Sequence, residues 1–324
     1  MEDAEAIADD DIFELASLTG LNGLSLRDAD KITINGIRGM ADLADMERLR
    51  FINVPAMDTE ALLILSQLPK LKALYLFGCE NITDESLNAI PKMNNLNELG
   101  VIGCDAVTEH GLKSIGSMEK LSSLIIMDMK LSPVLREFKQ IQKLIISIDS
   151  TEYEEALRDI SALSRLRHLH IINQRCVTAA DMDHLAKIPE LTTLALDGKM
   201  DEDGLASISN LNTLQELSFS IVETHDISKI RKIGQMTSLR KLEIHRSIIS
   251  ESLISGISEI PGLEEIVITA PSFISGEGLS ILAENCLNLK KFSILRMEGG
   301  ITTDDINDFI QNRPDVLFTY TMSP

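Results

Sequence analysis

The residues best suited to chemistry are His168 and His170, which lie two positions apart in a stretch typical of a β-strand. Side chains two apart on a strand point to the same face of the sheet. Imidazole serves as a metal ligand or a general base, but either role needs a third group, and Asp197 in the following segment is the nearest candidate. We therefore interpret the two histidines as the polar rim of a binding surface and expect no metal site.

Motifs that carry catalysis are missing from the sequence. It contains no G-x-S-x-G, G-x-x-x-x-G-K-[ST], H-E-x-x-H or G-x-G-x-x-G, which mark nucleophile elbows, phosphate loops, zinc sites and dinucleotide-binding turns. Acidic clusters such as Asp201-Glu202-Asp203 and Asp304-Asp305 occur where helices are predicted to begin, and carboxylates there complement the helix dipole. We expect a protein that is not an enzyme and uses no cofactor.

The four cysteines lack the spacing of a metal site or a disulfide framework. Cys79 and Cys104 share one position of a repeat, where a buried thiol acts as a small hydrophobe. Cys286 precedes a predicted strand. Cys176 falls in a loop and is the best candidate for a reactive thiol, although we expect it to be inert.

These residues are positioned by an internal repeat. The stretch 71–115 holds two copies, LKALYLFGCENITDESLNAI and LNELGVIGCDAVTEHGLKSI, and Leu74 and Leu99 give a period of 25 residues (99 − 74). Thirteen pairs of apolar strand positions follow this period, with spacings of 20–26 residues. Such a period with L-x-x-L-x-L predicts an α/β leucine-rich-repeat solenoid, a right-handed horseshoe with a parallel sheet on the concave face and helices on the convex face.

The repeat also predicts where the elements begin. Residues 1–19 form an acidic amphipathic segment that we interpret as an N-terminal cap. The residues expected on its apolar face are Ile7, Ile12, Leu15, Ala16 and Leu18. Residues 20–324 are predicted to form one domain of about 13 repeats, with an irregular or 3₁₀ segment in the short repeat near 124–143, which contains Pro133. Hydroxyl side chains are predicted to cap helices at Thr83, Thr108, Thr178, Ser250 and Thr302 or Thr303.

The last predicted strand, in VLFTYTMSP, has an outer edge without a predicted partner. Proteins usually shield such an edge. Three explanations stay open: the sequence continues in a longer chain, Pro324 helps to hide a short edge, or two copies pair through this edge in a dimer.

Composition narrows the class of partner. The chain has 324 residues and a formal net charge of −20, which disfavours nucleic acid and anionic membrane surfaces. Residues 1–15 are acidic rather than typical of a signal peptide, and no run of about 18 apolar residues is present to span a bilayer. We expect a cytoplasmic or nuclear protein with a protein or peptide partner. Secretion as an effector is an alternative that stays open.

The segments Gly78-Cys79 to Thr83 and Gly103-Cys104 to Thr108, together with Cys286-x-x-Leu289, resemble the cysteine-containing subclass of leucine-rich repeats. That subclass is known from F-box substrate receptors of cullin-type ubiquitin ligases, so the resemblance implies a scaffold that recognises other proteins. An F-box-like helical module is not recognised, and the chain contains no tryptophan. A role as a ligase substrate receptor therefore stays an alternative.

The concave face is the expected site of binding. The residues before, between and after the buried strand leucines should point to it, and an exposed apolar patch usually marks an interaction site. A neighbouring segment that covers the patch is the alternative. We predict that the protein is a non-catalytic protein-interaction scaffold. Besides the ligase substrate receptor, the alternative is a pathogen effector or an enzyme regulator, such as a GTPase activator that uses Arg48 or Arg50. The predicted partner-binding residues are Tyr75, Phe77, Ile102, Ile125, Met127, Lys143, Ile145, His168, His170 and Ile172.

Overall fold

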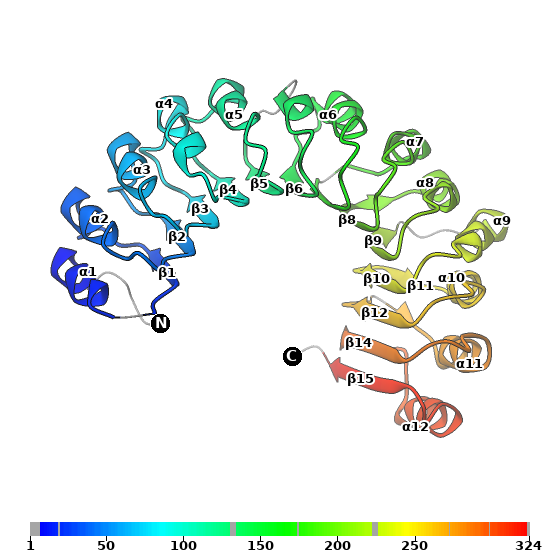
Figure 1. The fold of residues 1–324 in the computed structure, drawn as a ribbon. Coiled ribbons are helices and arrows are strands. Elements are labelled where there is room, and N and C mark those ends of the chain that lie inside the picture. Colours follow the sequence, from blue (N-terminus) through cyan, green and yellow to red (C-terminus); the bar gives the residue numbers. More distant parts are fainter. Residues whose placement is uncertain are drawn as a thin grey trace. The chain divides into compact units, whose positions relative to one another are not determined.

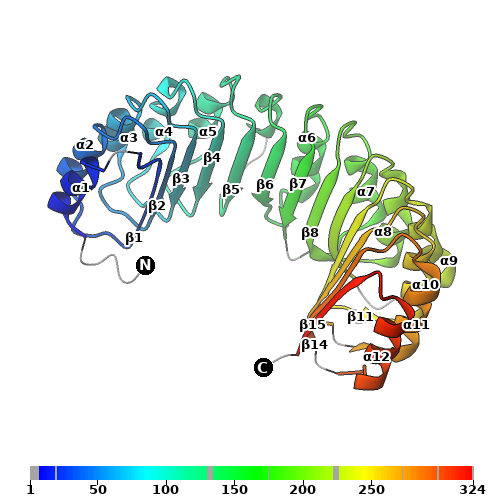
Figure 2. The same cartoon turned by 60° about the horizontal axis from the view of Figure 1, so that its bottom comes forward.

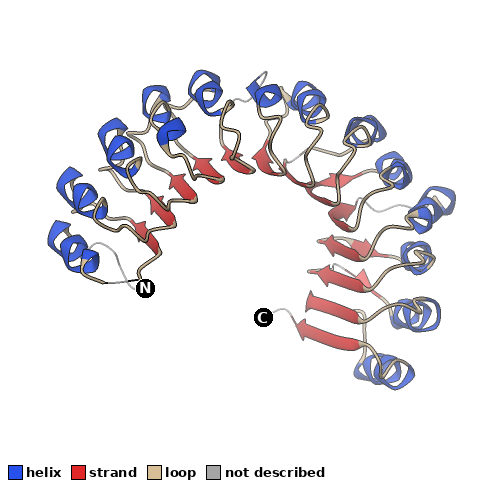
Figure 3. Cartoon of the chain, viewed as in Figure 1, coloured by secondary structure: helices blue, strands red, loops and turns tan. Residues whose placement is uncertain are grey.

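The computed structural model describes residues 7–18, 20–129, 134–173, 175–221, 226–271, 273–297 and 299–322. The chain forms two compact units, residues 1–166 and 167–324. In both, a strand, a turn and a helical segment alternate along the chain (Figure 1). Figure 3 shows the same alternation by element type.

The first unit contains a parallel run of strands that pair in chain order. These strands are β1 (Gly23–Arg27), β2 (Arg48–Ile52), β3 (Ala73–Phe77), β4 (Glu98–Ile102), β5 (Ser123–Met127) and β6 (Lys143–Ser147). Its helical segments are α1 (Asp9–Ala16), α2 (Ile34–Met40), α3 (Thr59–Leu65), α4 (Asp84–Leu87), η2 (Ile90–Lys92), α5 (Glu109–Ile115), η3 (Val134–Glu137) and α6 (Tyr153–Ile160).

The second unit repeats this plan. Its main strands are β7 (His168–Ile172), β8 (Thr193–Met200), β9 (Glu216–Ile221), β10 (Lys241–His245), β12 (Glu265–Thr269), β14 (Lys291–Met297) and β15 (Leu317–Met322). A separate short pair consists of β11 (Ile248–Ile249) and β13 (Phe273–Ile274). Its helical segments are α7 (Ala179–Leu185), α8 (Glu202–Ser207), η4 (Ile208–Asn210), α9 (Ile227–Ile230), η5 (Arg231–Gln235), α10 (Glu251–Ser258), α11 (Gly276–Asn285) and α12 (Thr303–Asn312).

Each unit has two layers, strands on one side and helices on the other (Figure 2). On β3, Leu74 and Leu76 are fully buried between the layers, whereas Tyr75 and Phe77 are only partly buried on the open side. The strands pair residue for residue, so that Leu74 lies opposite Leu99, and buried leucines from successive repeats stack into one core. The predicted α/β arrangement of a parallel sheet covered by helices is confirmed.

The turn after each strand in the first unit explains the Gly-Cys motif. The residue that follows β1 to β5 has a positive φ of 50–62° in every case, at Asp28, Asn53, Gly78, Gly103 and Asp128. Glycine adopts this left-handed conformation without the strain of a Cβ, and Asp and Asn tolerate it better than most residues. The next residue then turns inward: Cys79 and Cys104 are 1 % exposed, and the Cys79 thiol donates to the Phe51 carbonyl at 3.8 Å.

The predicted helix starts are confirmed. Thr83, Thr108, Thr178, Ser250 and Thr302 are the N-cap residues of α4, α5, α7, α10 and α12. At the last position the cap is Thr302, whose hydroxyl accepts a hydrogen bond from the backbone N–H of Asp305, and not Thr303. The hydroxyls of Thr83, Thr108, Ser250 and Thr302 accept hydrogen bonds from N–H groups of the first helical turn.

Helix α1 packs onto the first repeat in the way that later helices pack onto each other. The Asp9 carboxylate accepts hydrogen bonds from the backbone and side chain of Thr33, at 2.7 and 2.5 Å, and Ile12 is fully buried. The expectation that Leu18 shares this apolar face is wrong, because it follows the end of the helix and is 54 % exposed. A capping role for residues 1–19 stays a prediction.

The short repeat contains the predicted 3₁₀ segment, η3, between β5 and β6; Pro133 lies outside the described residues. Arg136 of η3 forms a salt bridge with Asp159 of α6, whose side chain is completely buried. A single 3₁₀ turn thus replaces the longer helix here and is fixed to the next repeat by a buried charge.

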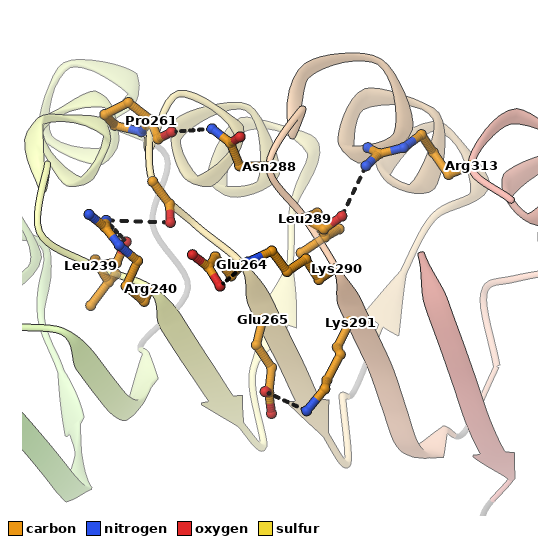
Figure 4. Close-up of polar contacts among 11 residues, drawn as sticks. Leu239, Arg240, Pro261, Glu264, Glu265, Asn288, Leu289, Lys290, Lys291 and Arg313 are labelled. Carbon is orange, nitrogen blue, oxygen red and sulfur yellow. Dashed lines mark hydrogen bonds and ion pairs between the residues drawn. The ribbon is translucent and has the colours of Figure 1, made fainter. Parts of the chain in front are cut away.

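Polar contacts join successive repeats at the end of the second unit (Figure 4). Lys290 pairs with Glu264 at 2.7 Å, and the Asn288 amide donates to the Pro261 carbonyl at 2.7 Å. Arg313, whose side chain is 10 % exposed, donates to the carbonyls of Cys286 at 2.8 Å and of Leu289 at 3.0 Å. It therefore satisfies backbone groups that would otherwise be buried without a partner.

Candidate functional site

Strand register in the first unit brings together seven of the predicted partner-binding residues. Tyr75, Gly100, Ile125 and Ile145 lie opposite one another on β3 to β6. A second column joins Phe77, Ile102 and Met127. We call the predicted residues here the β3–β6 surface: Tyr75, Phe77, Ile102, Ile125, Met127, Lys143 and Ile145. Lys143, at the start of β6, is exposed, and the other six are partly buried.

Two aromatic rings and an arginine pack together on this surface. The rings of Tyr75 and Phe77 meet edge to face, with centroids 5.8 Å apart. The guanidinium carbon of Arg50, on β2, lies 4.9 Å from the Tyr75 ring centroid and 5.8 Å from that of Phe77. These distances are within the range of cation–π attraction, so Arg50 is held against the ring pair.

Gly100 makes room for the rings. A Cβ at this position would lie 2.8 Å from Cδ1 of Tyr75 and 3.0 Å from Cε1 of Phe77, closer than carbon atoms normally approach. The rings therefore lean from β3 over the backbone of β4. Burial there, with the nearby Glu98 carboxylate, raises the pKa of the Tyr75 phenol to about 12, so the hydroxyl stays protonated and can donate a hydrogen bond.

The remaining predicted residues lie in the second unit. His168, His170 and Ile172 share one face of β7, opposite the buried Leu169 and Ile171. Their grouping with the β3–β6 surface stays a prediction.

His170 contacts Asp197, the residue that the sequence offered as the nearest third group. Its Nε2 lies 2.9 Å from Oδ1 of Asp197 on β8. In the described part of the chain, no three His, Cys, Asp or Glu side chains are placed to hold a metal ion.

A polar hollow of about 310 Å³ lies over β7 to β10 in the second unit. The Ser218 hydroxyl lies 2.7 Å from Nε2 of His245, and Glu243 lies 3.8 Å from the same nitrogen. A serine triad instead needs a carboxylate at the other ring nitrogen, Nδ1, to orient the base. Lys241 pairs with Glu243 at 2.7 Å, so the groups form a closed polar network. Alternation along β9 and β10 places these side chains on the open face, but the contact between the serine and the histidine was not predicted from the sequence.

The other chemical candidates do not join these surfaces. A hollow of about 770 Å³ at the loops after β4 and β5 is bordered by Asp105, His110 and Asp128, and contains none of the predicted residues. Partial burial, with the carboxylates of Asp201 and Asp181 nearby, raises the pKa of the exposed Cys176 thiol. A raised pKa lowers the thiolate fraction, which agrees with an inert cysteine. Among the described residues, no helix has the length and apolar content needed to cross a membrane.

Comparison with known proteins identifies the fold. No model of a protein family matches the sequence, and no curated protein matches it. Among solved structures, the chain is similar to an internalin (inlF) from Listeria monocytogenes, with 16 % identity, 99 % of this chain and 91 % of the other covered, and a TM-score of 0.52.

Two further structures are similar over most of this chain. A chain of the Rad7 and Elc1 complex in yeast has 19 % identity, coverage of 97 % and 84 %, and a TM-score of 0.61. A structure of the TLR13–ssRNA13 complex has 15 % identity and a TM-score of 0.57; the match covers 95 % of this chain but only 54 % of the other. At these identities the likeness is one of fold. Repeat sequence, layer order and structural neighbours together give this chain the leucine-rich-repeat solenoid fold.

Proposed function

We propose that this protein is a non-catalytic interaction scaffold and that the β3–β6 surface binds a protein or peptide partner. The observation that carries the proposal is the pair of apolar columns, built from four adjacent strands and centred on Tyr75, Phe77 and Ile125. These side chains lie on the face of the sheet that helices do not cover. Contiguous apolar surface of this kind usually marks an interaction site.

The dimensions suit a short segment of a partner. Four strands spaced by about 4.8 Å extend over roughly 14 Å, and a five-residue strand adds a similar length in the other direction. An extended peptide or two turns of a helix fit such an area, with the aromatic rings as anchors.

Affinity purification with matched variants tests this proposal. Ile125→Asp places a charge at the centre of the surface, and Leu63→Asp places the same charge on α3, where Leu63 is 38 % exposed in the helix layer. We expect the Ile125→Asp protein to lose partners that the wild type and Leu63→Asp retain. Identical partners for all three folded proteins would refute the β3–β6 surface as the binding site.

The same purification separates two narrower proposals. The resemblance of the Gly78-Cys79 and Gly103-Cys104 repeats to the cysteine-containing subclass keeps a ubiquitin-ligase substrate receptor under consideration, and recovery of cullin components with the wild type would support it. A GTPase regulator is the other proposal. A GTP-hydrolysis assay with the captured partner, comparing wild type with Arg48→Ala and Arg50→Ala, tests it, and unchanged hydrolysis would exclude it.

The outer edge of β15 is a second candidate interface. Leu317, Tyr320 and Met322 are 62, 47 and 57 % exposed on this strand, and exposed strands readily pair with another chain. We propose edge pairing between two copies of the protein. Sedimentation velocity should show a dimer that Tyr320→Asp weakens, and a monomer at all concentrations of the wild type would refute the proposal.

A further inference from the structure

We infer that the partner of the β3–β6 surface presents an acidic peptide segment, and that Arg27, Arg48 and Arg50 bind its carboxylates beside the aromatic pair. This inference rests on the proposed function and adds the chemistry of the partner.

The three arginines border the β3–β6 surface directly. Arg48 and Arg50 alternate on β2 and point to the same open face, where both are exposed. Arg50 lies opposite Tyr75 on β3. Arg27, also exposed, ends the neighbouring strand β1, opposite Ile52. The basic side chains on β1 and β2 therefore lie directly beside the apolar side chains on β3.

Arg27, Arg48 and Arg50 form no ion pair among the described residues; Arg158 and Arg165 of the same unit form none either, but they lie apart from these three, on and after α6. By contrast, Arg38 pairs with Glu60, and Arg136 pairs with Asp159. The whole chain carries 50 acidic and 30 basic residues, so three neighbouring arginines on one face contrast with the acidic character of the chain. The hydrogen bond from Lys72, with a smaller contribution from the charge of Arg48, lowers the pKa of Glu47, which pairs with Lys72. Three neighbouring cations that form no salt bridge among the described residues nonetheless point to an anionic ligand from outside.

The geometry favours carboxylates on an extended peptide. Stacking of the Arg50 guanidinium on the Tyr75 ring, at 4.9 Å, restrains the side chain while its N–H groups remain available at the edge of the plane. A guanidinium binds a carboxylate with two parallel hydrogen bonds. Arg48 and Arg50 stand two residues apart, about 7 Å along the strand. Acidic residues at alternate positions of an extended peptide repeat at the same distance.

A single-stranded nucleic acid also binds arginine and aromatic side chains. Its long polyanionic backbone, however, would approach a chain whose net charge is −20, and that repulsion opposes binding. A peptide with a few carboxylates next to apolar residues engages the arginines and the β3–β6 surface together, without extending a polyanion over the rest of the protein. The charge distribution therefore favours the peptide.

Selection from a phage-displayed library of short random peptides, on the immobilised full chain, tests the inference. We expect enriched peptides to combine Asp or Glu with an aromatic or aliphatic residue. An enriched peptide, made with a fluorescent label, should bind the Arg48→Gln/Arg50→Gln protein at least roughly tenfold more weakly than the wild type, because each charged hydrogen bond contributes measurably. The Arg158→Gln/Arg165→Gln protein loses the same charge at two exposed sites on and after α6 and should bind as the wild type does.

The outcomes are distinguishable from failure of the proposed function. If Ile125→Asp abolishes binding but neither the arginine variant nor amide substitution of the peptide's acids changes it, the surface stands and the acidic partner is refuted. Selection that yields no peptide dependent on Arg48 or Arg50 also overturns the inference. Tighter binding of a single-stranded uridine homopolymer than of the selected peptide, lost in the same arginine variant, would assign the arginines to nucleic acid instead.

Discussion

Two neighbouring residues on β5 allow a direct test of which face of the sheet is core. Leu124 is completely buried and lies opposite Leu99 and Leu144, whereas Ile125 is partly buried and lies opposite Gly100 and Ile145. Truncation of a fully buried leucine removes its transfer free energy and leaves a cavity, so Leu124→Ala should lower the free energy of unfolding by about 2–5 kcal/mol. Ile125→Ala should cost about 1 kcal/mol, less than the ~1.5–3 kcal/mol of complete burial, because one side of Ile125 already faces solvent.

Urea denaturation followed by far-ultraviolet circular dichroism measures both variants. Repeat proteins can depart from two-state unfolding. We therefore compare two variants of the same strand in the same repeat, so that any such departure affects both equally. The denaturant dependence (m-value) of each variant should match that of the wild type. Equal losses, or a greater loss for Ile125→Ala, would refute the alternation of core and open faces, and with it the β3–β6 surface.

Three other changes test interactions that lie between repeats. Arg136→Ala should destabilise the protein by about 2–3 kcal/mol in urea, because it leaves the buried Asp159 carboxylate unpaired, and a loss below 1 kcal/mol would show that the contact behaves as a surface pair. Arg313→Met should lower the free energy of unfolding by about 1–3 kcal/mol, because buried carbonyls such as that of Leu289 lose their hydrogen-bond donor. Hydrogen exchange should become faster in α11 and β15, and unchanged exchange would contradict this role. Burial raises the pKa of Cys104 from 9.0 to about 11, so the folded state holds the proton more tightly than the unfolded state does. The stability that results is complete below pH 9 and is lost as pH rises towards about 11, by roughly 3 kcal/mol; Cys104→Ala should therefore lose less stability than the wild type between pH 8 and pH 11, and parallel losses would contradict the assignment.

Local chemistry explains why much of the fold can be predicted from the sequence. The period of 25 residues places Leu74 opposite Leu99, because each repeat packs mainly on its neighbours and pairing by one period buries both leucines. Thr83 and Thr108 cap helices because their hydroxyls satisfy the first N–H groups. Alternation along each strand then assigns Tyr75 and its column to the open face.

Contacts between side chains are where prediction from the sequence ends. Alternation places Arg50, Tyr75 and Gly100 on one face, but the lean of the ring over Gly100 and the stacking of the guanidinium depend on side-chain rotamers. Ser218 and His245 meet although strand register places Ser218 opposite Glu243, because the imidazole reaches diagonally across the strands. A periodic pattern contains no information about that reach.

The sequence by itself determined the repeat, the parallel strands, the helix caps and the division of residues between core and open face, since each follows from spacing and from groups close along the chain. Only the tertiary structure decided which side chains are partners: the burial of Asp159 against Arg136, and the three arginines that make no ion pair among the described residues. The physical reason is that a charge is paired or free according to what lies within a few ångströms of it. That distance is set by strand register and rotamers together, across segments far apart in the chain.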